Sequence, residues 1–123
     1  MRVMVFVKAT ADSEKGFMPS PEMDKMFEEM GRFNAELVKA GIMKVGECDG
    51  LRPTSQAKRV SFDGASRTVR DGPFKEDQLV AGYWIWTVTD MDEAVSWVKR
   101  CPNPMMGPSD IDIRPIYEKA DFR

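Results

Sequence analysis

The sequence predicts one α+β domain in which an antiparallel β-sheet carries two helices on one face. The chain has 123 residues, a length typical of a single domain spanning residues 1–123. Hydrophobic residues make up 42% of the chain, which is enough to build a core. About six strand-like runs accompany only two helical stretches. Because a parallel sheet needs a crossover helix between strands, this ratio favours an antiparallel sheet.

The N-terminal third predicts a strand, a loop and a helix. Residues 2–8 are apolar on both faces of a strand, which suits the centre of a sheet. Residues 9–19 are polar and interrupted by glycine and proline, which predicts a loop. Ser20 and Pro21 predict the start of a helix over residues 21–40, which Gly41 ends. Its apolar stripe follows the 3.6-residue period: Met23, Met26, Phe27, Met30, Phe33, Leu37 and Val38.

The middle of the chain predicts four further strands. A short strand is expected at residues 42–47. Residues 58–62 alternate polar and apolar side chains, which predicts a half-exposed strand. Asp63-Gly64 predicts the turn of a hairpin to residues 67–70. Residues 78–88 contain two tryptophans and a tyrosine among β-branched neighbours, so this strand needs a covered sheet.

The C-terminal third predicts a helix and a last strand. Asp90 is the expected N-cap of the helix, and Pro102 prevents its continuation. A proline-rich loop over residues 102–109 leads to a strand at residues 111–116. The resulting order of elements fits a ferredoxin-like antiparallel sheet with both helices on one face.

One face of such a sheet has no helix to cover it. The strands at residues 2–8 and 78–88 are nevertheless apolar on both faces. An uncovered apolar sheet face is a docking surface. We therefore expect a homodimer in which the sheets of two copies pack face to face.

Composition excludes several classes of function. The chain contains no histidine, which rules out Ser-His-Asp and Cys-His hydrolases and histidine-bearing zinc sites. The formal charge of −2 argues against nucleic acid as a partner. No apolar stretch approaches the roughly 20 residues that span a bilayer, and no signal peptide or membrane partner is expected.

No metal, cofactor or glycine-rich phosphate loop is indicated. Cys48 and Cys101 form no CxxC unit; they either form one disulfide or stay free, and free thiols in a cytoplasmic protein are the expectation.

Several motifs together resemble one known family. Asp71-Gly72-Pro73-Phe74 is a DGPF tetrapeptide, and residues 81–86 (AGYWIW) follow it. Residues 50–53 (GLRP) precede it, and residues 111–116 (IDIRPI) close the chain. In order and spacing, over nearly the whole chain, these motifs resemble the DGPF-domain branch of the YCII-related family.

The resemblance implies a dimeric α+β barrel built from ferredoxin-like protomers. Some YCII-like proteins are enzymes thought to use a His-Asp pair, for example to dechlorinate a hydroxylated aromatic ring. This chain has no histidine, so that chemistry does not carry over. Many DGPF members carry a glutamate near position 87, where this chain has Thr87. DGPF-type domains also resemble proteins encoded with, or fused to, extracytoplasmic-function sigma factors, which implies regulation.

Acidic residues near the DGPF turn are the first candidates for a site. In the functional interpretation, Asp71 orients a ligand or acts as a base. In the structural interpretation, Asp71 accepts backbone N–H bonds and so stabilises its turn. Phe74 either contacts a ligand or plugs the core. Glu76 and Asp77 are further acids available to an enzyme.

Arginines and aromatic residues complete the candidate set. Arg52 and Arg114 are candidates because a guanidinium binds carboxylate or phosphate with two hydrogen bonds. For Arg114 the alternative is an ion pair at the sheet edge. Tyr83, Trp84 and Trp86 either line an apolar pocket or form core and interface. Strand alternation puts the two tryptophans on one face and Tyr83 on the other, without telling which face meets the helices.

Two functions remain open at this point. One is a small-molecule-binding protein or enzyme that acts as a homodimer with a cleft near the DGPF turn. The other is a non-catalytic regulatory module that binds another protein. The methionine stripe of residues 23–30 favours ordinary core packing over an adaptable binding groove.

Overall fold

The computed structural model of the chain describes residues 1–16, 19–75 and 79–122. The strands are β1 (Arg2–Lys8), β2 (Cys48–Gly50), β3 (Lys58–Asp63), β4 (Ser66–Asp71), β5 (Val80–Thr87) and β6 (Ile111–Pro115). The α-helices are α1 (Ala11–Glu14), α2 (Pro21–Lys39) and α3 (Met91–Arg100), with short 3-10 helices η1 (Thr54–Gln56) and η3 (Lys119–Phe122).

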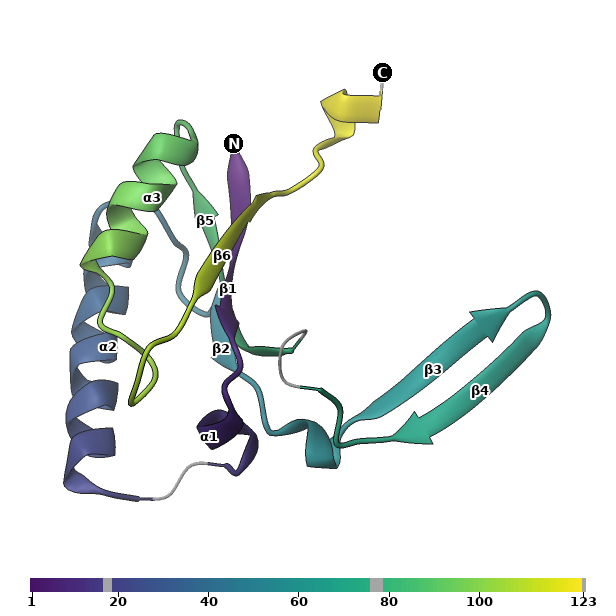
Figure 1. Cartoon of the computed structure of the whole chain (residues 1–123). Helices are drawn as coiled ribbons and strands as arrows, with labels where there is room; N and C mark the ends of the chain where they lie inside the picture. Colours follow the sequence, from purple (N-terminus) through teal and green to yellow (C-terminus); the bar gives the residue numbers. More distant parts are fainter. Residues whose placement is uncertain (17–18, 76–78, 123) are drawn as a thin grey trace.

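Four of these strands form an antiparallel sheet in the order β2-β5-β1-β6. With β3 and β4 set aside, this is the ferredoxin-like order, so the predicted α+β fold is confirmed. Helices α2 and α3 lie on the same face of the sheet (Figure 1). Strands β3 and β4 pair only with each other and are an insertion in the connection from β2 to β5.

The register of β1 against β5 decides which side chains meet the helices. Val3 lies opposite Trp86 and Val5 opposite Trp84, and all four are buried against α2 and α3. The ring of Phe33 on α2 meets both tryptophans edge-on, at centroid distances of 6.3 Å and 6.2 Å. The two tryptophans are therefore core residues that face the helices.

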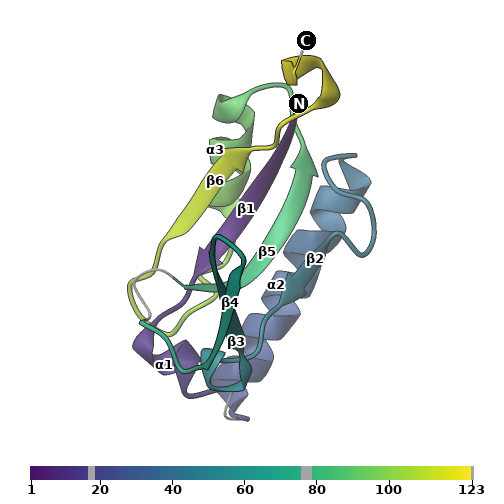
Figure 2. The same ribbon diagram turned by 90° about the vertical axis from the view of Figure 1, so that its right-hand side faces the viewer.

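The opposite face of the sheet carries no helix. Met4 lies across from Ile85, and Phe6 across from Tyr83, with each of the four side chains half-buried. Arg114 on β6 pairs with Met4 and shares this face. Figure 2 looks onto this surface, with both helices behind the sheet. We call it the open sheet face.

Both predicted helix caps are present. Ser20 Oγ accepts the N–H of Met23 at 3.1 Å, and Asp90 Oδ1 accepts the N–H of Glu93 at 2.9 Å. Gly41 follows α2 with a φ of 75°, the left-handed conformation that its position predicted.

Two predictions in the first half of the chain are wrong. Residues 42–47 form a turn, because the N–H groups of Ile42 and Met43 both bond back to the carbonyl of Leu37 at the end of α2. Their side chains are buried in the core, and the strand begins only at Cys48. Residues 9–19 contain α1 rather than loop alone, since Thr10 and Ser13 form a reciprocal capping box.

The predicted hairpin is present, but it is not the half-exposed pair that its alternation indicated. Every residue of β3 and β4 is exposed. The hairpin projects from the side of the sheet opposite the helices (Figures 1 and 2). We call residues 58–71 the arm.

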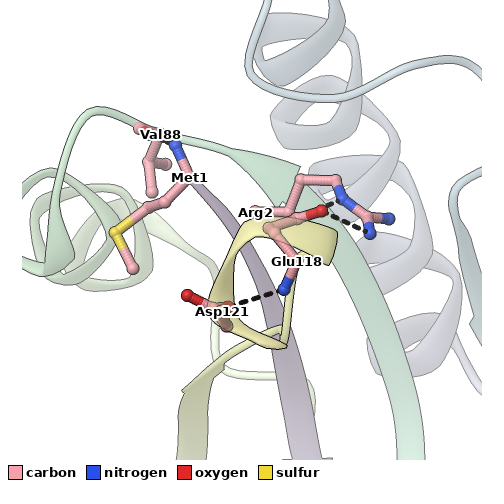
Figure 3. A network of polar contacts seen from close by, with 5 residues as sticks. All are labelled: Met1, Arg2, Val88, Glu118 and Asp121. Atoms are coloured by element: carbon pink, nitrogen blue, oxygen red, sulfur yellow. Dashed lines mark hydrogen bonds and ion pairs between the residues drawn. The ribbon is translucent and has the colours of Figure 1, made fainter. Parts of the chain in front are cut away.

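The two ends of the described chain are joined (Figure 3). The nitrogen of Met1 donates to the carbonyl of Val88 at 2.8 Å. Arg2 Nε and Nη2 donate to the two carboxylate oxygens of Glu118 at 2.7 Å and 3.2 Å. The N–H of Glu118 in turn donates to Asp121 Oδ2 at 2.7 Å. These contacts fix η3 beside the start of β1.

No helix in the described residues is long and apolar enough to cross a membrane. Within the same residues, no cluster of three or more Cys, Asp and Glu side chains is arranged to hold a metal ion. Both cysteines are free thiols, as expected.

Candidate functional site

A cavity of about 310 Å³ lies between the N-terminal half of α2 and the β2 edge of the sheet. We call it the apolar cavity. The residues that line it come from α2, from β1, β2 and β5, and from the loop before β6: Val7, Met26, Phe27, Met30, Asn34, Cys48, Asp49, Gly50, Ala81, Gly82, Tyr83, Trp84, Pro104 and Met105.

Short strands and small residues leave this space open. Strand β2 has only three residues, and its Gly50 pairs with Gly82 of β5. A Cβ atom at Gly82 would lie 3.1 Å from the carbonyl oxygen of Asp49, so this close pairing favours glycine. Opposite them, α2 presents the flexible side chains of Met26 and Met30, which adapt to irregular shapes.

A few polar groups stand in the wall of the apolar cavity. Trp84 Nε1 donates to Asn34 Oδ1 at 2.8 Å, which leaves the Asn34 amide N–H groups for another acceptor. Tyr83 and Asp49 also line this cavity, but their side chains share the open sheet face, where the hydroxyl of Tyr83 donates to Asp49 Oδ2 at 3.1 Å; this bond raises the pKa of Tyr83. Burial raises the pKa of the Cys48 thiol. Both groups are therefore protonated at neutral pH.

A second cavity, of about 470 Å³, adjoins the first. We call it the polar cavity. Its lining comes mostly from the end of α1 and from residues 50–56: Ser13, Lys15, Gly16, Gly50, Leu51, Arg52, Pro53, Ser55, Gln56 and Ala81. Gly50 and Ala81 line both cavities, so the two are neighbours at the β2 edge of the sheet.

Two cations stand in the polar cavity. Arg52 Nη1 donates to Gln56 Oε1 at 3.3 Å, a neutral partner. Lys15 lies 3.6 Å from the carboxylate of Asp12 in an exposed pair, which is weak in water. The guanidinium of Arg52 thus has no carboxylate partner within the described chain, and it is suited to hold an anion.

The DGPF turn closes against the wall of the polar cavity through Thr54. The Thr54 hydroxyl donates to the Glu14 carboxylate and accepts the N–H of Phe74 at 2.9 Å. Gly72 is required at its position, because a Cβ atom there would lie 1.7 Å from the carbonyl oxygen of Thr54. The peptide bond from Gly72 to Pro73 is cis. The turn therefore fixes the base of the arm to α1 and η1.

The comparison with protein families identifies the chain. The model of the YCII-related domain matches residues 1–118. The chain belongs to the YCII-related family. A search of curated proteins found no match.

In this YCII-related chain the predicted site residues do not form one cluster. Tyr83 and Trp84 line the apolar cavity, and Arg52 lines the polar cavity. Trp86 is fully buried in the core. Arg114 lies on the open sheet face, where no ion pair to it is present among the described residues.

Asp71 and Phe74 lie at the base of the arm. Asp71 is 73% exposed and pairs with Lys58 across the hairpin at 2.6 Å. Phe74 is half-buried beneath Arg59, whose guanidinium carbon lies 3.9 Å from the ring centroid, and it does not join the core cluster. Glu76 and Asp77 lie outside the described residues.

Sequence reasoning missed several residues that line the cavities. Asn34 interrupts the apolar stripe of α2 four residues after Met30, and this polar break was a usable signal. The helical spacing predicts core packing for Met26 and Met30; Met30 does pack against the core, and both residues also border the apolar cavity. Lys15 gave no signal, since only the folding of α1 brings it beside Arg52.

Proposed function

We propose that this YCII-related domain binds a small molecule with an apolar body and an anionic group. The observation that carries this proposal is that the two cavities are neighbours and share Gly50 and Ala81 in their linings. The apolar body occupies the space between α2 and β5, and the anionic group lies near Lys15 and Arg52. Ligand pockets commonly combine an apolar lining with a few placed polar groups. The tetrapeptide Asp71-Gly72-Pro73-Phe74 supports placing the chain in the DGPF branch.

Binding is favoured over catalysis by the chemistry of the wall. The chain has no histidine. Cys48 and Tyr83 hold their protons, because burial in one case and the Asp49 bond in the other raises the pKa. Neither is an activated nucleophile or a ready base at neutral pH. Asp71 remains the candidate base if the domain is an enzyme.

Three ligands of equal chain length test the proposal: octanoate, 1-octanol and octylammonium. Titration calorimetry at pH 7 should show octanoate binding most tightly. Arg52→Gln should weaken octanoate binding about tenfold and leave octanol unchanged. Equal affinity for all three ligands would show that the cleft does not select an anionic group and would contradict that part of the proposal.

Blocking variants locate the apolar part. Met26→Trp should abolish binding of octanol and octanoate, whereas Met23→Trp, one turn earlier on α2 and outside the cavity lining, should not. Asp71→Asn and Arg114→Gln should bind as the wild type does. Loss of binding in Asp71→Asn alone would move the site to the base of the arm.

We further propose that the domain works as a homodimer in the cytoplasm, with two open sheet faces packed together. The half-buried side chains of Met4, Phe6 and Ile85 on a face without helices support this arrangement. Sedimentation at micromolar concentration should give a dimer, and Phe6→Arg should give a monomer. A monomeric wild type would contradict the proposal.

Binding of another protein, such as a sigma factor, is the second candidate, and the exposed arm is the feature that favours it.

A further inference from the structure

The arm exposes apolar side chains that no other part of the described chain covers. Val60 is 46% exposed, Phe62 72% and Val69 60%. A two-stranded hairpin without a covering layer is at best marginally stable in water. Such a segment is expected to gain its covering from another molecule.

The register of the hairpin sorts its residues into two unlike faces. Val60 pairs with Val69, and Phe62 pairs with Arg67, whose guanidinium carbon lies 4.6 Å from the centroid of the Phe62 ring. Residues on one face of a strand alternate with those on the other, so Val60, Phe62 and Val69 share one face. The other face holds only polar and charged residues: Arg59, Ser61, Asp63, Ser66, Thr68 and Arg70. All three apolar residues of the ladder thus lie on one face, which they share with Lys58, Arg67 and Asp71, so the arm has one partly apolar face and one polar face.

Charge distinguishes the arm from the rest of the molecule. Its basic residues outnumber its acidic residues by two, whereas the whole chain carries a formal charge of −2. The rest of the chain is therefore clearly acidic. Arg59 and Arg70 even lie directly opposite each other in the ladder, and neither has an acidic partner among the described residues. Like charges in this position destabilise a hairpin, and the net negative charge of a second copy nearby would offset that effect.

The position of the arm indicates which molecule covers it. The arm rises from the same side of the sheet as the open sheet face (Figures 1 and 2). A second copy packed on that face would lie beside the arm. Twofold symmetry would then place its own arm beside the first copy.

We propose that the arm reaches across to a second copy of this chain, with Val60, Phe62 and Val69 packed on the partner and the net positive charge of the arm close to the net negative charge of the rest of the partner's chain. The inference rests on the proposed sheet-face dimer and adds a second, separate contact to it. A second copy is favoured over an unrelated protein because charge complementarity and the shared side of the sheet both lead to it.

The first test replaces the apolar face of the arm. A triple variant with Val60→Thr, Phe62→Thr and Val69→Thr keeps residues that favour strands but removes the apolar area. Sedimentation equilibrium should show the dimer Kd rising about a hundredfold or more. The matched control carries Ser61→Thr, Ser66→Thr and Thr68→Ser on the opposite face, and its Kd should stay within about twofold of the wild type. Circular dichroism checks that both variants are folded.

The second test is amide hydrogen exchange over residues 58–71 in the wild type. Arm amides should exchange quickly in Phe6→Arg, where the proposed sheet-face dimer is lost, and slowly in the wild-type dimer. An unchanged Kd in the triple variant together with fast arm exchange in the wild-type dimer would overturn the inference and leave the sheet-face dimer standing. A wild type that is monomeric at all concentrations would overturn both. Protection of the arm by a different protein, with the chain itself monomeric, would also overturn it.

Discussion

The indole N–H of Trp84 donates to Asn34 Oδ1 at 2.8 Å and so joins β5 to α2 in the lining of the apolar cavity. Trp84 is buried, so water cannot replace this acceptor. Asn34→Leu should therefore lower the free energy of unfolding by about 1–3 kcal/mol. Asn34→Asp keeps an acceptor and should lose less. Urea denaturation measures both, and equal stability of Asn34→Leu and the wild type would contradict this role of the bond.

Gly72→Ala tests the close approach of the DGPF turn to Thr54. The added Cβ atom would overlap the carbonyl oxygen of Thr54, so turn and η1 must separate. We expect a loss of about 1–3 kcal/mol, measured by urea denaturation, together with faster amide exchange over residues 54–57. Gly31→Ala is the control, because nothing lies within 4 Å of its Cβ position on α2. That change should stabilise the domain by about 0.5–1 kcal/mol.

The Tyr83–Asp49 bond predicts a dependence of stability on alkaline pH. Hydrogen bonding to Asp49, followed by its negative charge, raises the pKa of Tyr83 in the folded state. The stabilisation is therefore complete below the ordinary tyrosine pKa of about 10 and is lost as pH rises through the higher folded value. Asp49→Asn should lower the Tyr83 pKa toward the ordinary value. Carbon NMR of ring-labelled tyrosine in a Tyr117→Phe background measures it, and an unchanged Tyr83 pKa would rule out the Asp49 contribution.

The Arg2–Glu118 pair predicts an effect at acidic pH. The hydrogen bond from Arg2 is the main cause that lowers the pKa of Glu118. The negative charge of Asp121 acts in the opposite direction and raises it. The stabilisation is present above the ordinary glutamate pKa and is lost as pH falls through the lower folded value. Arg2→Ala should raise the Glu118 pKa and speed amide exchange across η3. Lys119→Ala should leave both unchanged, and similar behaviour of the two variants would show that the pair does not hold η3.

Thiol labelling tests the burial of the cysteines. Desolvation raises the pKa of Cys101 to about 12, and that of Cys48 rises above its ordinary value for the same main reason. At pH 8 both thiols should react with iodoacetamide far more slowly than a free cysteine, and Cys101 should react more slowly than Cys48. Measuring Cys48→Ser and Cys101→Ser separately assigns each rate. Labelling of Cys101 at the rate of the unfolded chain would contradict the burial that raises its pKa.

Local signals predicted much of the fold. Ser20 and Asp90 cap their helices as expected, since a cap depends on residues three positions apart. Strand alternation correctly placed Trp84 and Trp86 on one face. Which face meets the helices was not predictable, because Phe33 and Leu37 of α2 complete that core from a distant part of the sequence.

The errors arise where a local pattern has two physical outcomes. Ile42 and Met43 are apolar and could form a strand, but they bury their side chains while closing the end of α2. The alternation of polar and apolar side chains at residues 58–62 indicated a strand with one covered face. Such a pattern does not tell whether the covering layer belongs to the same chain or to another molecule. The cavities depend on α1, α2, β2 and β5 together, so no single motif predicted them.

Thr54 contacts both α1, through Glu14, and the base of the arm, through Phe74 and Gly72. Lys15, the residue after Glu14, stands in the polar cavity. A ligand that moves α1 would therefore strain the hydrogen bonds by which Thr54 holds Glu14 and the base of the arm. If the arm joins the proposed dimer, thermodynamic reciprocity makes dimer formation and ligand binding in the cleft alter each other's equilibrium by the same factor.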